Sequence, residues 1–407
     1  MITLLPPVEI PPTAGLPAKW RDLTALSGGL AAKLARTLAI PQPALTCSGT
    51  AALIIALRTL QQRLPGRTKL IVPAYTCPLV ALAVHYCSPL VVVPCDLAVN
   101  SIDLDRQQLS SLCDEQTLAV VVTHLAGRVA DVDGPKKIAA ASGAAIIEDA
   151  AQAMGALDEG QSVGLKGDIA FFSMAIGKGM TTAEGGVLFS RDPELNQKLL
   201  RRSREDLPFN FSWELRRTAE LWGYTLFYRP RGLYFVYGKA LRQALAVGDT
   251  VKAVGDDFTV QGIPLHSLGS YRQRVAVGAL ARLPDFLRQG RQRAATRIAQ
   301  LEQLPGVVVL ADHAGKQGIW PFILLLMPNQ TLRDAAMAGL WTSGLGITRL
   351  FIHTLMDYPA VKPFLQQSGQ CPNAEHLATC GLSISNSAWL SDDLFAQVVQ
   401  RLRAVLV

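Results

Sequence analysis

The chain has 407 residues, 49% of them hydrophobic and 17% charged, and its formal net charge is +7. Its length exceeds what one ordinary core requires, so we expect two domains with a large buried interior. The sequence contains no repeats or low-complexity runs. This composition argues against a disordered or repeat protein and favours an α/β enzyme.

Seven cysteines are present without any Cys-x-x-Cys pair. This pattern argues against a zinc site or a disulfide framework, so we expect buried thiols and no metal. The amino-terminal residues lack the basic start and apolar core of a secretory signal, which predicts a cytoplasmic protein. The charge alone would allow nucleic-acid binding, but no recognition module supports it, and we expect no nucleic-acid partner.

Six short apolar runs alternate with amphipathic stretches in the first half of the chain. Runs of this length are typical of buried, mostly parallel strands, and their alternation with helices predicts a doubly wound sheet. They lie at residues 70–72, 90–93, 118–122, 144–147, 169–172 and 187–189. The clearest helices are expected at 51–64 and 135–141. A smaller domain should be closed by an amphipathic helix at the carboxyl end.

Asp149 follows one of these strands directly. In open sheets of this kind, ligands bind beyond the carboxyl ends of the strands. A carboxylate at that place can pair with a protonated pyridine nitrogen and hold it charged, which makes the ring an electron sink. The alternative is that Asp149 only caps the next helix.

Lys178 lies six residues after the strand at 169–172. Its amine can form a Schiff base with an aldehyde cofactor, and the glycines around it would let backbone and cofactor approach closely. Ser173, five residues earlier, is placed to donate its hydroxyl to a phosphate. The segment is not a P-loop, because Gly179 stands where Ser or Thr is required and Phe172 where the first glycine is required. A solvated surface lysine is the alternative.

The triplet Ser48-Gly49-Thr50 precedes the helix expected at 51–64. Free amides at a helix amino end, with two hydroxyls beside them, form an anion site of phosphate size. An ordinary helix cap would explain the triplet alone. Together with Asp149 and Lys178, however, it describes a ligand with a phosphate, a ring nitrogen and an aldehyde. Pyridoxal phosphate (PLP) fits that description.

Six motifs, in order across nearly the whole chain, resemble the DegT/StrS sugar aminotransferases, a family of fold type I PLP enzymes. They are SGTAAL at 48–53, VPAYTC at 72–77, THLAGRVADVDG at 123–134, EDAAQA at 148–153, FFSMAIGK at 171–178 and AEGG at 183–186. The resemblance implies a large domain with a mostly parallel sheet and a smaller carboxy-terminal α+β domain. It also implies a homodimer.

The resemblance implies a role for seven residues around the cofactor. Lys178 would bond to the aldehyde, and Asp149 would partner the ring nitrogen. Gln152 would contact the phenolic oxygen of the cofactor, and Ala151 would pack beneath its ring. Gly49, Thr50 and Ser173 would hold the phosphate.

Two positions depart from the family pattern. Cys77 stands where an aromatic side chain usually stacks on the cofactor, with Tyr75 two residues earlier, so stacking should be weak or supplied differently. Ser270 stands where an asparagine reaches the cofactor phosphate of the partner subunit, which implies a weaker cross-subunit contact.

The implied function is transfer of an amino group from an amino acid, by analogy glutamate, to the keto group of a nucleotide-linked deoxysugar. The product would serve polysaccharide or glycoconjugate biosynthesis. Lys178 would move the proton while Asp149 keeps the ring charged. Lys178 also argues against the family's sugar dehydratase branch, where histidine replaces it. A PLP-dependent dehydratase or cyclising enzyme, and a non-catalytic PLP-binding regulatory protein, remain as alternatives.

We expect an amino-terminal arm at 1–15, a large PLP-binding domain at 16–269 and a small domain at 270–407. The large domain should carry an insertion at about 205–262. Ten of the 27 Phe, Trp and Tyr residues lie within 209–237, interleaved with arginines. The insertion could cover the active site or a dimer interface, or contact an anionic membrane surface through about 209–242.

Overall fold

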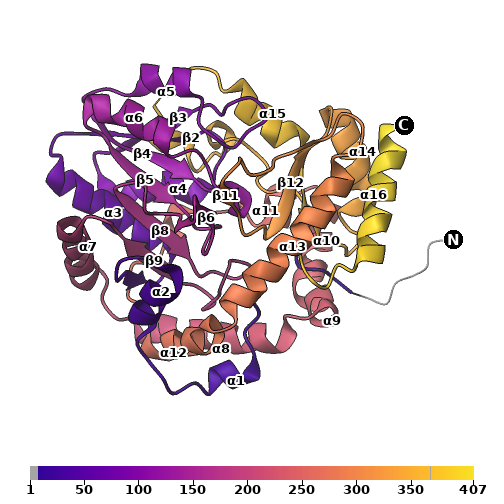
Figure 1. Cartoon of the computed structure of the whole chain (residues 1–407), viewed down its shortest axis with the longest axis horizontal. Helices are drawn as coiled ribbons and strands as arrows, with labels where there is room; N and C mark the ends of the chain where they lie inside the picture. Colours follow the sequence, from indigo (N-terminus) through magenta and orange to yellow (C-terminus); the bar gives the residue numbers. More distant parts are fainter. Residues whose placement is uncertain (1–7, 367) are drawn as a thin grey trace.

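The computed structural model describes residues 8–366 and 368–407, so residues 1–7 of the expected amino-terminal arm lie outside the described part. The larger part of the molecule contains a seven-stranded sheet with the order β1-β9-β8-β5-β4-β2-β3 (Figure 1). Strands β8, β5, β4, β2 and β3 are parallel, and β9 pairs antiparallel with both β8 and β1. The strands are β1 Ala44–Thr46, β2 Lys69–Pro73, β3 Val91–Cys95, β4 Thr117–Thr123, β5 Ala145–Asp149, β8 Ile169–Ser173 and β9 Gly186–Phe189.

All six predicted strands are confirmed, and so is the predicted fold class. Side chains are buried on both faces of the sheet: Leu70 and Val121 pack on one side, and Ile71 and Val120 on the other. This two-sided burial is why the strands are continuous apolar runs in the sequence. The first face is covered by α3 Gly49–Arg63, α4 Pro78–Leu82 and α7 Pro193–Asp206, and the second by α2 Leu30–Leu38, α5 Arg106–Leu112 and α6 Asp133–Ser142. Helices α3 and α6 confirm the two predicted helices.

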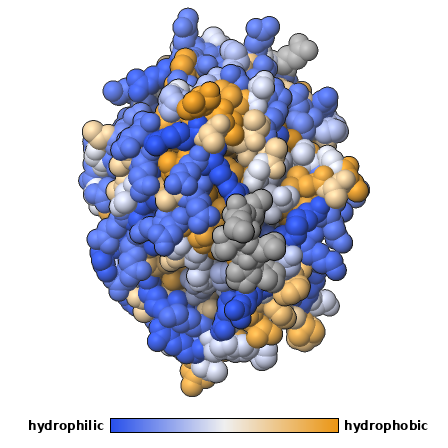
Figure 2. Space-filling model, turned by 90° about the vertical axis from the view of Figure 1, so that its right-hand side faces the viewer, coloured by the Kyte–Doolittle hydropathy of each residue, from blue (hydrophilic) through white to orange (hydrophobic). Residues whose placement is uncertain are grey.

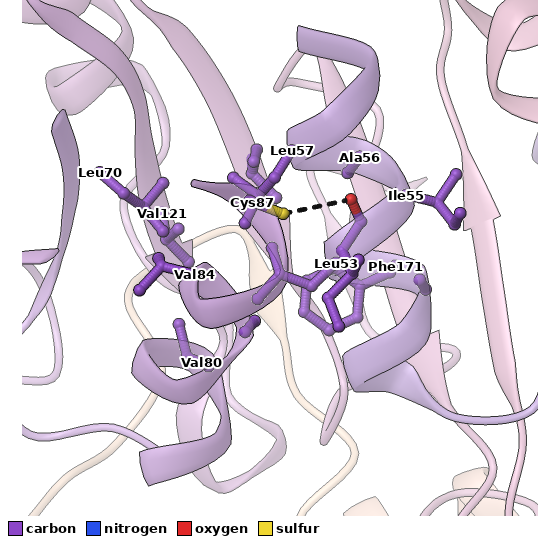
Figure 3. Close-up of a cluster of buried hydrophobic side chains, with 14 of the residues drawn as sticks. Leu53, Ile55, Ala56, Leu57, Leu70, Val80, Val84, Cys87, Val121 and Phe171 are labelled. Atoms are coloured by element: carbon purple, nitrogen blue, oxygen red, sulfur yellow. Dashed lines mark hydrogen bonds between the residues drawn. The ribbon is translucent and has the colours of Figure 1, made fainter. Parts of the chain in front are cut away.

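The core between α3 and the sheet contains one of the thiols expected to be buried. Leu53 and Leu57 of α3 meet Val80 and Phe171 there, and the Cys87 thiol donates a 3.8 Å hydrogen bond to a backbone carbonyl of α3 (Figure 3). Burial raises the pKa of Cys87 to about 12, so this side chain stays an uncharged thiol.

The carboxy-terminal part contains a four-stranded antiparallel sheet with the order β10-β12-β14-β13. Helices α14 Gln330–Leu340 and α16 Asp392–Leu406 pack with it in one core, and α16 is the predicted closing helix. This arrangement confirms the expected smaller α+β unit. The strands are β10 Val308–Val309, β12 Phe322–Leu326, β13 Ile347–Thr348 and β14 Gly381–Ser385.

The two parts are joined by helices and by a small sheet. Helix α12 (Ser270–Leu280) packs on α1 (Trp20–Leu23) and α2, and the long helix α13 (Leu283–Leu301) then runs toward the smaller sheet (Figure 1). In the small sheet, β6 Leu157–Asp158 pairs with β11 Lys316–Gln317 on one side and with β7 Gln161–Ser162 on the other. The division at 269/270 remains a proposal about the chain, and it falls at the start of α12, which still packs on the larger part. The change from one core to the other takes place along α13.

The insertion is helical. Its elements are α8 Phe211–Phe227, α9 Pro230–Leu233, the π-helical turn η3 Tyr234–Gly238, α10 Lys239–Ala246, α11 Thr250–Val254 and η4 Val260–Gly262. Helix α8 lies at the lower edge of the molecule beside α12 (Figure 1). No helix in residues 8–366 and 368–407 combines the length and the apolar character needed to span a membrane.

A buried ion pair attaches the insertion to the rest of the molecule. Arg272 of α12 is fully buried, and its Nε donates a 2.9 Å hydrogen bond to Glu214 of α8. Its Nη1 donates to the backbone carbonyls of Thr182, at 3.0 Å, and Glu184. One guanidinium therefore joins α8, α12 and the loop between β8 and β9.

We expect Glu214→Ala to lower the free energy of unfolding by about 3–5 kcal/mol, because it leaves the Arg272 charge buried without its partner. Urea denaturation would measure the change. The control is Glu205→Ala, which removes an exposed carboxylate paired with Arg201 and should alter stability little. A loss no greater than that of the control would contradict this account of the ion pair.

Candidate active site

A cavity of about 480 Å³ lies where the carboxyl ends of β4, β5 and β8 meet the amino end of α3. Its walls bring together eight of the nine site residues predicted from the sequence, although these are distributed over 130 positions of the chain, from 49 to 178. The eight are Gly49, Thr50, Cys77, Asp149, Ala151, Gln152, Ser173 and Lys178. Ser270, the ninth, does not line it.

Asp149 is the last residue of β5 and is almost fully buried. Burial raises the pKa of its carboxyl group, while a 3.0 Å hydrogen bond from the Ala151 amide and the nearby charge of Lys178 oppose this effect. A turn, not a helix, follows Asp149, so the alternative that it caps a helix is wrong. A cation placed beside this carboxylate would be strongly stabilised.

Lys178 lies in the loop between β8 and β9 and is partly buried. Burial lowers the pKa of its amine, against the opposing influence of Cys77 and Asp149. A lowered pKa favours the neutral, nucleophilic amine. Lys178 lines the cavity, so it is not the solvated surface lysine that the sequence left as an alternative.

The end of the amino-terminal arm and the residue after it hold this loop in place. The amide of Leu16, which directly follows the arm, donates a 3.2 Å hydrogen bond to the Gly179 carbonyl. A Cβ on Gly15 would lie 2.6 Å from the Lys178 carbonyl oxygen, and Gly177 has a φ of +81°, so both positions favour glycine. Thr13 of the arm also lines the cavity, a contribution that the sequence analysis missed.

The amino end of α3 forms a small concave site with β8. The Ser48 hydroxyl caps the helix by accepting a 3.0 Å hydrogen bond from the Ala51 amide, so the cap interpretation is right for Ser48. Gly49 and Thr50 begin the helix, where amides have no acceptor within it. A Cβ on Gly49 would lie 3.2 Å from that of Ser173, so the glycine lets the helix end approach the Ser173 hydroxyl. These groups suit a phosphate.

Hydrogen bonds fix two further polar side chains on the cavity wall. The Gln152 Oε1 accepts from the Ala126 amide at 2.8 Å, which leaves its NH₂ group as a donor. His124 lines the cavity and was not identified from the sequence, although it lies in one of the motifs. Its Nδ1 accepts from the Ala130 amide at 3.1 Å, so its Nε2 donates to Glu148, 2.9 Å away.

Cys77 lines the cavity at the position where the family has an aromatic residue, and burial raises the pKa of its thiol to about 12. Tyr75 cannot supply a stacking ring, because it is 2% exposed and its hydroxyl forms hydrogen bonds with the backbone of Phe351.

Ser270 begins α12 and is exposed. Its contact with a partner subunit remains a prediction.

The insertion supplies one wall of the cavity, which the sequence analysis offered only as one alternative. The lining residues from this segment are Tyr237, Val254, Gly255, Asp256 and Phe258. Asp256 Oδ2 accepts hydrogen bonds from the Tyr358 hydroxyl, at 2.6 Å, and from the Ile352 amide, at 3.0 Å. The insertion is thereby tied to the segment between β13 and β14, close to Arg349, which also lines the cavity.

The doubly wound sheet, with a buried carboxylate and a lysine converging on one cavity at its strand ends, is the arrangement expected of a fold type I PLP-dependent transferase. A sequence model of the DegT/DnrJ/EryC1/StrS aminotransferase family matches residues 22–206 and 273–403. The chain belongs to this family. The residues between the matched parts, 207–272, nearly coincide with the predicted insertion.

Individual proteins agree with this membership. The chain is 33% identical to the protein MosB of Rhizobium meliloti over 56% of its own length and 41% of that protein. It is 36% identical to GDP-perosamine synthase of Caulobacter vibrioides, over 38% of its own length and 42% of that protein. The match therefore spans about two fifths of each relative. The crystal structure of the aminotransferase TlmJ from Streptoalloteichus hindustanus superposes over 98% of both chains with a TM-score of 0.73 at 21% identity, which shows the common fold.

Asp256 allows a test of how the insertion is held. Burial raises the pKa of its carboxyl group from 3.8 to about 6, so its favourable contribution to folding is complete below pH 3.8 and is lost as the pH rises through 6. Asp256→Asn keeps an acceptor oxygen but cannot ionise. We expect the variant to gain thermal stability over the wild type at pH 7.5, and this gain to shrink toward pH 5. A pH-independent difference in melting temperature would contradict the burial of a titrating carboxyl group.

Proposed function

We propose that the chain is an aminotransferase that moves an amino group from an amino acid, with glutamate as the first candidate, to the keto group of a nucleotide-linked deoxyhexose. The observation that carries the proposal is the placement of Lys178 and Asp149 on one cavity, beside the anion site formed by α3 and Ser173. Family membership supports the reaction class.

The residues of the cavity fit PLP. The amides of Gly49 and Thr50, with the Ser173 hydroxyl, would hold the phosphate. Asp149 would face the ring nitrogen, and the free Gln152 NH₂ group would donate to the phenolic oxygen. Ala151, partly buried on the same wall, would pack beneath the ring. The bound cofactor would supply an electron sink for the pair of electrons released at the donor's α-carbon.

Lys178 is the residue that would bond to the cofactor aldehyde and, once displaced by the donor amine, act as the base. Its lowered pKa allows the neutral Nζ to take the α-proton of the amino acid and later return a proton. The Asp149 carboxylate would hold the ring nitrogen in its charged form throughout, a fixed electrostatic contribution that requires no rearrangement.

Two features support the proposed acceptor. One relative carries the name GDP-perosamine synthase, which denotes formation of a GDP-linked amino sugar. The cavity also presents Arg349, whose Nη2 is held by the carbonyls of Ile352 and Ala378 at 2.8 and 2.6 Å. A fixed guanidinium suits a phosphate or carboxylate of a substrate. A role in polysaccharide or glycoconjugate biosynthesis, in the cytoplasm and as a homodimer, follows as part of the proposal.

We expect borohydride reduction of the PLP-loaded protein, followed by peptide mass spectrometry, to place the cofactor on Lys178. Lys178→Ala should yield no such peptide, because no amine would remain at the aldehyde. Lys198→Ala, which removes an exposed lysine of α7, is the control and should label like the wild type. Labelling at another lysine would contradict the assignment.

Asp149→Ala should retain the covalent cofactor but slow the single-turnover reaction with glutamate or glutamine by about 100-fold or more, because the ring nitrogen loses its counter-charge. The absorbance change of the cofactor reports this half-reaction. Asp285→Ala, at an exposed site on α13, should react at the wild-type rate. An unchanged rate in the Asp149 variant would contradict its proposed role.

The acceptor is tested by adding keto-sugar nucleotides to the pyridoxamine form of the protein. Amino-sugar formation with one equivalent of keto acid released from the donor is the expected result. Product formed without consumption of an amino donor would favour the dehydratase or cyclising alternative. Covalently bound cofactor that reacts with no amino donor would favour the non-catalytic alternative.

A further inference from the structure

Helix α8 carries an apolar stripe on its exposed side. The stripe residues recur every third or fourth position, which places them on one face of a helix. They are Phe211, Leu215, Ala219, Trp222 and Leu226, and the four large side chains among them are 50–70% exposed. The opposite face packs inward through Leu221 and Tyr224. Helix α8 is therefore apolar on two sides. The side with Leu221 and Tyr224 is covered by the described chain, and the stripe is not.

The exposed apolar surface continues beyond α8. Phe227, Phe235 and Val236 are 48%, 65% and 59% exposed. Of the fourteen large apolar side chains that are exposed in the described chain, eight lie within residues 209–236. Figure 2 shows hydrophobic side chains near the lower edge of the molecule, at the height at which α8 and α9 lie in Figure 1. Scattered exposed apolar residues are normal, but a concentration of this kind marks an interaction surface.

After Glu220, the charge of this segment has one sign. Residues 221–248 contain no Asp or Glu. Arg229, Arg231 and Lys239 are exposed, and none of them forms an ion pair with the residues that the structure describes. By contrast, Arg216 on α8 is paired with Glu220. The three unpaired cations therefore lie at the start of α9, within α9 and directly after η3.

We propose that this surface, residues 209–239, binds peripherally to an anionic lipid bilayer. Aromatic and aliphatic side chains would enter the interface, and the three free cations would contact lipid phosphates. A second copy of the chain is a poorer occupant. A second copy would bring three further unpaired cations to the contact and, within residues 221–248, no carboxylate to pair with them.

The surface and the cavity share one short element. Val236 of η3 is exposed, whereas its neighbour Tyr237 lines the cavity. Lipid binding would therefore bring the cavity close to the headgroups, although the proposal does not depend on the reaction that takes place there.

The test is flotation of the full-length protein with vesicles of phosphatidylcholine alone or mixed with phosphatidylglycerol. We expect binding to the anionic vesicles only, and weaker binding at high salt. The double charge reversal Arg229→Glu/Arg231→Glu should lower the partition coefficient about tenfold or more. The matched control is Arg401→Glu/Arg403→Glu, two exposed arginines at the same spacing on α16, which should bind like the wild type.

A second variant, Phe235→Ser/Val236→Ser, tests the apolar contribution and should also weaken binding. Circular dichroism and the Lys178 labelling reaction would establish that each variant is folded. Absence of binding to anionic vesicles, or equal losses in the α16 control, would overturn the proposal. Light scattering supplies a further test, because it measures the mass of the assembly. A smaller assembly in the serine variant, together with a wild type that does not bind vesicles, would overturn the proposal, because the surface would then be a contact between proteins.

Discussion

The arrangement of the cavity depends on one buried guanidinium. Arg272 holds Glu214 of α8 and the carbonyls of Thr182 and Glu184, which lie in the same loop as Lys178. A buried charge is tolerated only when its partners are complete, so each element fixes the others. The insertion is thus an integral part of the fold and not an appendage of an otherwise finished domain.

Burial acts in opposite directions on the two groups that matter most for the chemistry. It lowers the pKa of Lys178 and raises that of Asp149, so removal from water favours the neutral form of each. The neutral amine is the form that attacks an aldehyde. The carboxyl group, in turn, regains its charge most readily beside a cationic partner. Burial beside one cavity therefore suits both residues to the ligand that we propose.

The parts of the fold that could be predicted from the sequence are those in which consecutive residues are buried together. Strands buried on both faces, such as β4 and β5, appear as unbroken apolar runs, and the motifs around Asp149 and Lys178 carry the chemistry in a few consecutive residues. Strand β1 has three residues, too few for a pattern. Asp256 and Arg349 belong to no motif, and they line the same cavity only because the insertion packs against the segment between β13 and β14. Such tertiary contacts leave no periodic signal in one sequence.

The arm at the start of the chain has a consequence for biosynthesis. Its backbone amides at Ile10 and Ala14 donate to the carbonyls of Gly344 and Pro321, which leave the ribosome much later. While the chain is still being translated, the large sheet can form before these two acceptors exist, so the arm can contact only the Lys178 loop and the insertion. The cavity wall at Pro12 and Thr13 is therefore fixed at both ends only after the small sheet has formed.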